Sequence, residues 1–182
     1  NPTAKLNRSL VAAASIGNVE ILSLLFNDHR VDKELVHLEL LKKAIEKKKI
    51  EAIKFLLKDI DFNPFKNKND LTGLALKDNF EDAAVEIVKN KYFDPSINFD
   101  IDLDNAVYYE SIALLKIILN NNKSDPSRDN NRLITYASEN DLNEIIDLLF
   151  ENIKVRKTLH KDNPELFAKL NKKTISNKLD NF

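Results

Sequence analysis

Alanine recurs along the chain at a fixed interval of 31 residues. The positions are Ala13, Ala44, Ala75, Ala106, Ala137 and Ala168. Pairs of mostly apolar residues keep the same register: eight and nine residues after the first alanine come Ile21-Leu22, and twelve and thirteen after it come Leu25-Phe26. Apolar positions three and four residues apart predict a helix with one buried face. A fixed period of this length is the signature of a stacked-repeat protein.

Within each period the pattern predicts two short helices joined by a tight polar turn. The expected pairs cover residues 9–15 with 20–27, 38–46 with 50–58, 71–77 with 81–90, 100–109 with 111–120, and 131–139 with 142–152. A last unit keeps Ala168 and ends in a mostly polar helix over residues 174–181, as a terminal cap requires. The fold class is therefore all-α, a solenoid of about six helix–turn–helix repeats.

We expect one repeat domain over residues 1–182. Its units are residues 7–37, 38–68, 69–99, 100–130 and 131–161, with a capping unit at 162–182 and a short lead-in at 1–6. The chain begins Asn1-Pro2 and contains no methionine, so we interpret it as a fragment or a processed domain of a longer protein.

Composition and charge argue against several classes of function and site. Charged residues make up 31% of the chain but nearly cancel to a net charge of −1, which argues against non-specific nucleic-acid binding. The absence of cysteine excludes disulfides, thiolate metal sites and cysteine nucleophiles. No apolar run approaches the roughly 18 residues of a spanning helix. We expect a monomer inside a cell, in the cytoplasm or delivered into a host cytoplasm, with no membrane contact.

The repeats resemble those of the ankyrin family. The run from Ala14 to Phe26 is similar to the second half of an ankyrin repeat, and Leu56-Leu57 keeps its double apolar ending. The connectors that begin at Phe93 and Ser124, each followed by Asp-Pro-Ser, resemble those of amoebal, giant-virus and amoeba-infecting bacterial ankyrin arrays. The Thr-Pro-Leu-His opening of the family is absent and the period is about two residues short, so the presence of β-hairpin fingers stays open. Another helix-pair solenoid is the alternative.

Little in the chain points to chemistry. Asp100, Asp102 and Asp104 have the spacing that opens a calcium-binding EF-hand loop, but its twelfth position is Ser111 rather than a carboxylate. The three histidines form no metal motif, and two glycines cannot build a phosphate loop. We expect no enzyme activity, no cofactor, and no catalytic or metal-binding residue.

The resemblance implies that residues two and three places after each alanine face a concave groove that binds another protein. The candidates are Ile16, Glu46, Lys47, Lys77, Asp78, Tyr108, Tyr109, Glu139 and Asn140. Tyr108 and Tyr109 stand out because tyrosine is enriched at binding hot spots. The expected function is a protein–protein interaction scaffold. Two alternatives stay open, namely a targeting or substrate-recruiting domain of a larger enzyme or effector, and a self-associating structural solenoid.

Overall fold

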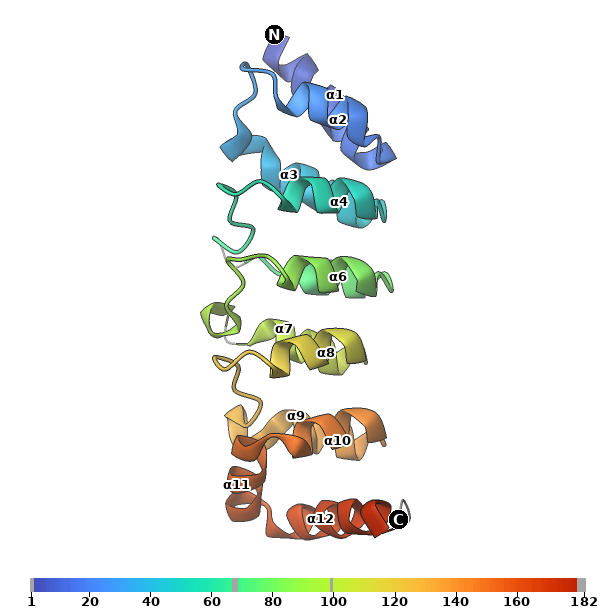
Figure 1. Ribbon diagram of the computed structural model, residues 1–182, viewed down its shortest axis with the longest axis vertical. Helices are drawn as coiled ribbons and strands as arrows, with labels where there is room; N and C mark the ends of the chain where they lie inside the picture. The colour runs from blue at the N-terminus through green and yellow to red at the C-terminus, as the bar shows by residue number, and fades with distance from the viewer. Residues whose placement is uncertain (1, 67–68, 99, 180–182) are drawn as a thin grey trace. The chain divides into compact units, whose positions relative to one another are not determined.

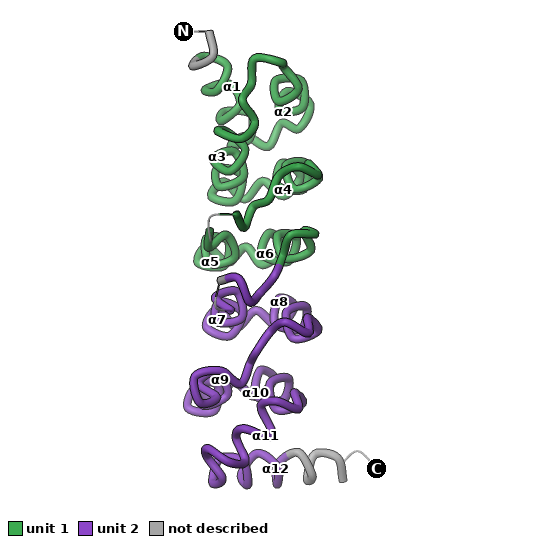
Figure 2. Tube along the Cα trace, turned by 90° about the vertical axis from the view of Figure 1, so that its left-hand side faces the viewer, with its two compact units in different colours: residues 1–93 green, residues 94–182 purple. Residues whose placement is uncertain are grey.

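The fold is entirely helical in the residues that can be described. The computed structural model describes residues 2–66, 69–98 and 100–179. These ranges form twelve α-helices and one short 3₁₀ helix and contain no strand (Figure 1). The predicted all-α class is therefore confirmed, and the connectors in these ranges carry no β-hairpin fingers. The helices fall into two compact units, residues 1–93 and 94–182 (Figure 2).

The first unit consists of three helix pairs. Its helices are α1 (Pro2–Ile16), α2 (Val19–Phe26), α3 (Lys33–Glu46), α4 (Ile50–Leu57), α5 (Leu71–Leu76) and α6 (Glu81–Val88). Each odd-numbered helix packs on the even-numbered helix that follows it. The odd-numbered helices also contact one another, as do the even-numbered ones, so the unit has two layers of helices (Figure 2).

The second unit begins with the same arrangement and ends differently. Its elements are η1 (Pro95–Asn98), α7 (Ile101–Tyr108), α8 (Ile112–Leu119), α9 (Arg128–Glu139), α10 (Asn143–Glu151), α11 (Ile153–Asp162) and α12 (Pro164–Leu179). The pairs α7–α8 and α9–α10 pack side by side, with α7 against α9 and α8 against α10. Helix α11 then packs on α9 and α10, and α12 packs on α11.

Five of the six regularly spaced alanines lie in the buried core of the helix pairs. Ala44, Ala75, Ala106 and Ala137 are 0% exposed, and Ala13 is 5% exposed. A larger side chain at these positions would overlap the neighbouring helix in a closely packed interior. Ala168, the sixth of the series, lies exposed on α12 and has no such role.

The turn inside each helix pair has one geometry. A residue with positive φ follows the first helix at five positions 31 residues apart, namely Gly17, Lys48, Asn79, Glu110 and Asp141. The backbone N–H of the residue that follows it donates to the carbonyl oxygen of the buried alanine. Ser111, for example, donates to Ala106 at 2.8 Å. This is the hydrogen bond of a Schellman C-cap, which satisfies a carbonyl left free at the end of the first helix.

Four of these five positions hold a residue that has a Cβ atom, and the left-handed conformation is unfavourable for most such residues. Glu110→Gly is therefore expected to raise the free energy of unfolding by about 1 kcal/mol. Urea unfolding followed by circular dichroism measures the change. Asp141→Gly should stabilise less, because aspartate tolerates this conformation better. A Glu110→Gly variant no more stable than the wild-type protein would contradict the strain at this turn.

Several boundaries differ from the sequence prediction, and α3 begins at Lys33 rather than at residue 38. Residues 2–6 are not a lead-in but the first turns of α1. Residues 153–162, expected to be connector, form α11, where Val155 and Leu159 are fully buried and Asn152 caps the helix by accepting the N–H of Lys154 at 2.9 Å. The separate polar helix expected at 174–181 is instead the end of α12, which is continuous from Pro164 to Leu179; residues 180 and 181 lie outside the described residues.

Candidate functional site

The connector after each helix pair opens with a turn fixed by one side chain. An aspartate or asparagine accepts the backbone N–H two residues later, at 2.9 to 3.1 Å, five times at 31-residue intervals. The accepting residues are Asp28, Asp59, Asn90, Asn121 and Asn152. Such turns favour Asp and Asn because their short side chains reach their own backbone. The series is visible in the sequence, and the sequence prediction missed it.

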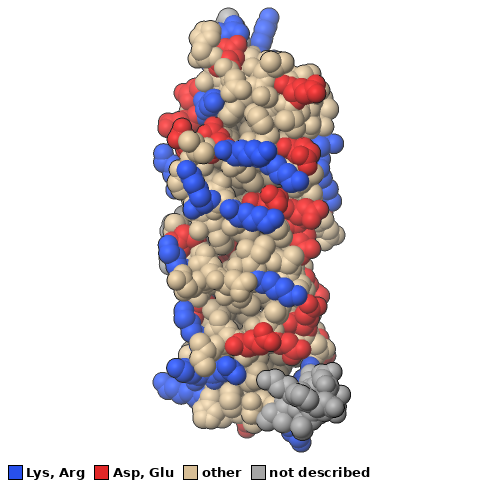
Figure 3. All heavy atoms as spheres, viewed as in Figure 1, with Lys and Arg blue, Asp and Glu red and all other residues tan. Residues whose placement is uncertain are grey.

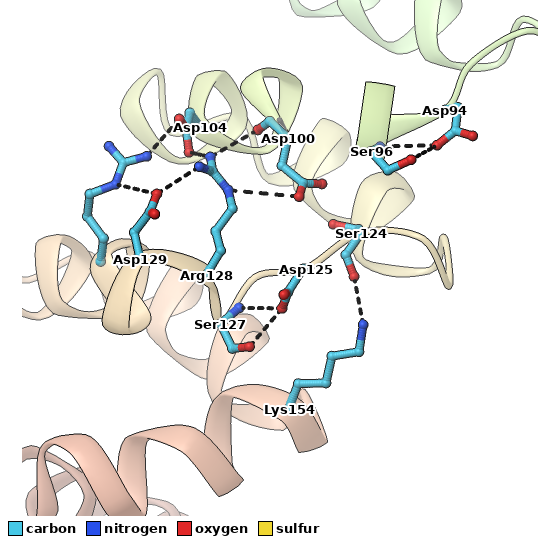
Figure 4. Close-up of polar contacts among 11 residues, drawn as sticks. Asp94, Ser96, Asp100, Asp104, Ser124, Asp125, Ser127, Arg128, Asp129 and Lys154 are labelled. Carbon is cyan, nitrogen blue, oxygen red and sulfur yellow. Dashed lines mark hydrogen bonds and ion pairs between the residues drawn. The ribbon is translucent and has the colours of Figure 1, made fainter. Parts of the chain in front are cut away.

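A second turn follows in the two Asp-Pro-Ser connectors (Figure 4). Asp94 accepts both the N–H and the hydroxyl of Ser96, at 3.1 and 2.7 Å. Asp125 does the same for Ser127 at the same two distances. These paired hydrogen bonds hold the aspartates in place, and the Lys123 ammonium also binds Asp94. The motif therefore fixes the connector before the next helix begins.

Arg128, the first residue of α9, links that helix to the start of α7 at a mostly buried ionic cluster (Figure 4). Its guanidinium binds the carboxylate of Asp104, and its Nε lies 3.8 Å from Oδ2 of Asp100. Arg132 binds the other oxygen of Asp104 at 2.8 Å. Burial raises the pKa of Asp100, while the Asp125 amide, the Arg128 charge and the Ser124 hydroxyl act in the opposite direction. The backbone around Arg128 is unusual as well, because Asp129 to Asn131 all have positive φ.

Two of the three aspartates with EF-hand spacing, Asp100 and Asp104, belong to this ionic cluster. Asp100 and Asp102 are 5% and 2% exposed, and Asp104 forms ion pairs with both Arg128 and Arg132. In the part of the chain that the structure describes, no group of three potential ligands is placed to hold a metal ion.

The nine candidate contact residues are all exposed, and they lie at the ends of the first helices. Each is the last helical residue, the capping residue or the residue after it, next to the positive-φ turn. Ile16, Glu46, Lys47, Lys77 and Asp78 belong to the first unit. Tyr108, Tyr109, Glu139 and Asn140 belong to the second.

The adjacent tyrosines have different surroundings. The ring of Tyr108 packs edge-on against Tyr136 with centroids 4.7 Å apart, and its hydroxyl accepts a hydrogen bond from Arg132. The same guanidinium lies 5.7 Å from the ring centroid of Tyr108. Tyr109 caps α7 and is 46% exposed, against 38% for Tyr108. Tyr108 is thus held by α9, whereas Tyr109 presents its side chain to solvent.

His37 is a buried polar residue that the sequence did not single out. It is 2% exposed, stacks on Phe62 with centroids 3.6 Å apart, and places Nε2 2.9 Å from the carbonyl oxygen of Leu56. Nδ1 lies 3.8 Å from a carboxylate oxygen of Asp59. Burial lowers the pKa of His37, although the Leu56 carbonyl and Asp59 partly oppose this. The ring therefore packs in the neutral form, with Nε2–H donating to Leu56.

The depressed pKa of His37 predicts a loss of stability in acid. Below the ordinary histidine value of 6.5 the unfolded chain takes up the proton more readily than the folded one, so the free energy of unfolding falls with pH. Urea unfolding between about pH 7 and pH 5 measures this slope. His37→Gln should flatten it, whereas His29→Gln, at a side chain that is 91% exposed, should retain it. An unchanged slope in His37→Gln would contradict the assignment.

Comparison with family models, curated proteins and solved structures finds no match. Within the described ranges, no helix combines the length and apolar character needed to span a bilayer.

Proposed function

We propose that the chain is an ankyrin-like repeat module that recognises another protein and has no chemistry of its own. The partner binds the exposed side chains at the ends of the first helices. Its contacts are Tyr109 above all, together with the polar residues at the other turns. The proposal rests on the family resemblance in the sequence and on the geometry of those turns.

The observation that carries the proposal is the recurrence of one rigid turn with changing side chains. The positive-φ residue and its hydrogen bond to the buried alanine recur at 31-residue intervals, while the exposed neighbours range from Ile16 to Glu46 and Tyr109. A backbone fixed before binding loses little conformational entropy when a partner docks. Constant scaffold positions with variable exposed positions are the arrangement of a recognition surface.

Tyr109 is the expected anchor. Tyrosine offers a large area with a polar tip and only two side-chain torsions, so ordering it costs little. Its neighbour Tyr108 is held by Arg132 and Tyr136, which keeps the end of α7 in place. Tyr109→Ala is expected to weaken partner binding about thirtyfold, the size of a typical hot spot.

Site-specific photo-crosslinking tests the proposal directly. A benzoylphenylalanine replaces Tyr109 in one variant and Asn120 in another, and each is irradiated in lysate. Asn120 is an exposed control that caps the other end of the α7–α8 pair. The proposal predicts a discrete crosslinked partner from position 109 and none from position 120. Equal crosslinking from both positions, or none from either, would contradict it. A product between two copies of the chain would identify self-association instead.

A further inference from the structure

Helix α11 has one buried face and one basic face. Val155 and Leu159 are 0% exposed, and the Thr158 hydroxyl donates to Oδ1 of Asn131 at 2.8 Å, so this face is fixed against α9. Apart from Val155, Thr158 and Leu159, every side chain between Ile153 and His160 is exposed. The cationic side chains of the helix are Lys154, Arg156, Lys157 and Lys161, with His160 between them.

These cations form one strip. Lys157 and Lys161 are four residues apart, as are Arg156 and His160, so both pairs lie on the outer side of the helix. Blue side chains gather over α11 in Figure 3, and red ones lie over the neighbouring α10. The acidic side chains exposed on α10 are Glu144, Asp147 and Glu151.

The cations of α11 differ in their partners, because the Lys154 ammonium donates to the carbonyl oxygen of Ser124 at 3.3 Å. Lys43, Lys54 and Lys89 each pair with a glutamate three residues away. Among the described residues, no carboxylate forms an ion pair with Arg156, Lys157 or Lys161. Like charges one turn apart repel each other and weaken a helix. Only the cations of the last turn gain from the helix dipole, and that gain does not extend to Arg156 or Lys157.

We propose that the exposed basic face of α11 binds a short acidic segment of a partner protein. The helix has 10 residues and is about 15 Å long, which matches about five extended residues of a peptide. The ligand chemistry is a run of aspartate or glutamate side chains, met by the guanidinium of Arg156 and the ammonium groups of Lys157 and Lys161. This surface is independent of Tyr109, because α11 and the end of α7 belong to different helix pairs.

The geometry favours a peptide over a nucleic acid or a bilayer. A nucleic acid carries charge well beyond 15 Å and would meet the acidic face of α10 next to the strip, whereas a short peptide ends before it. A helix that lies in a membrane interface inserts an apolar face. Val155 and Leu159 of α11 are buried in the fold, and Ile153, which is 55% exposed, is a single apolar side chain rather than a face.

The test uses a fluorescein-labelled peptide of about six glutamates and the whole chain, with anisotropy measured at about 50 and 300 mM NaCl. The wild-type chain should bind at low salt and release the peptide at high salt. Arg156→Glu with Lys157→Glu should weaken binding at least about tenfold. The matched control is Lys58→Glu with Lys66→Glu, which changes the net charge equally at two exposed lysines of α4 and its connector and should bind within about twofold of wild type. Circular dichroism melting shows whether each variant is folded.

Two further probes separate the possible ligands. Labelled single-stranded DNA of equal charge and vesicles containing phosphatidylserine are titrated under the same conditions. Tighter binding of either than of the peptide would overturn the proposal, as would equal weakening by both charge-reversal pairs, because that would reflect net charge alone. Tyr109→Ala should leave peptide binding unchanged, so loss of the proposed Tyr109 contact and loss of the α11 contact are distinguishable.

Discussion

Leu56→Ala is expected to lower the free energy of unfolding by about 2 to 5 kcal/mol. Leu56 lies in α4 with 0% of its surface exposed, and the repeating pattern places it among the apolar residues that pack one helix pair on the next. Truncating it removes buried methyl groups and leaves a cavity that the surrounding helices fill only in part. Urea unfolding of the whole chain, followed by circular dichroism, measures the loss.

The matched control is Leu24→Ala in α2. Leu24 is 77% exposed, so the same substitution removes little buried area and should change the free energy of unfolding by less than about 0.5 kcal/mol. Equal effects of the two substitutions would show that the buried columns assigned to the first unit are wrong.

Arg128→Met is expected to destabilise the protein by about 3 kcal/mol at neutral pH. Methionine has a similar length but no charge, so Asp100 loses its nearest cation while its side chain stays 7% exposed. Asp104 keeps Arg132, which limits the loss. Removing one partner of a buried pair is costly because the other charge is left uncompensated.

The pH dependence distinguishes this cause from a packing defect. Burial already raises the pKa of Asp100, and loss of Arg128 raises it further. In the unfolded chain Asp100 loses its proton at its ordinary pKa of 3.8, whereas in the folded chain it keeps the proton to a higher pH. The folded state therefore loses stability as the pH rises above this value. The defect should therefore shrink as the pH falls toward 4. A defect that is constant with pH would contradict the ionic explanation. Arg30→Met, at a side chain that is 55% exposed, should cause no measurable loss.

The regular part of the fold was predictable because one signal recurs. The alanines at 31-residue intervals and the apolar pairs that follow them mark both helices of each pair, and five of these alanines are buried. The turn between the helices was less visible, because its positive-φ position holds Gly, Lys, Asn, Glu or Asp. Only Gly17 signals that conformation by residue type.

Helix α11 was not predicted, because the repeat register places a connector there. At the four earlier positions, the turn held by an aspartate or asparagine side chain leads into a connector with no additional α-helix. Asn152 instead caps the helix Ile153–Asp162. The local signal was present in the buried residues Val155 and Leu159, which are one turn apart.

The residues of the candidate site were predictable by position but not by environment. The register predicts nine exposed positions that face a groove. The structure places all nine at exposed helix ends, and the groove stays a prediction. The difference between Tyr108 and Tyr109 depends on Arg132 and Tyr136, which come from another helix. The buried state of His37 likewise depends on Phe62, 25 residues away in the chain. A single sequence does not reveal such pairings.

Hydrogen–deuterium exchange of the whole chain, with and without the partner captured by crosslinking, tests the central claim most directly. We predict slower exchange in peptides covering residues 106–112, which contain Tyr109 and its turn, and unchanged exchange in peptides covering the C-terminal end of α8 at residues 118–122. Protection at 118–122 without protection at 106–112 would show that the partner binds elsewhere and that the ends of the first helices are not its recognition surface.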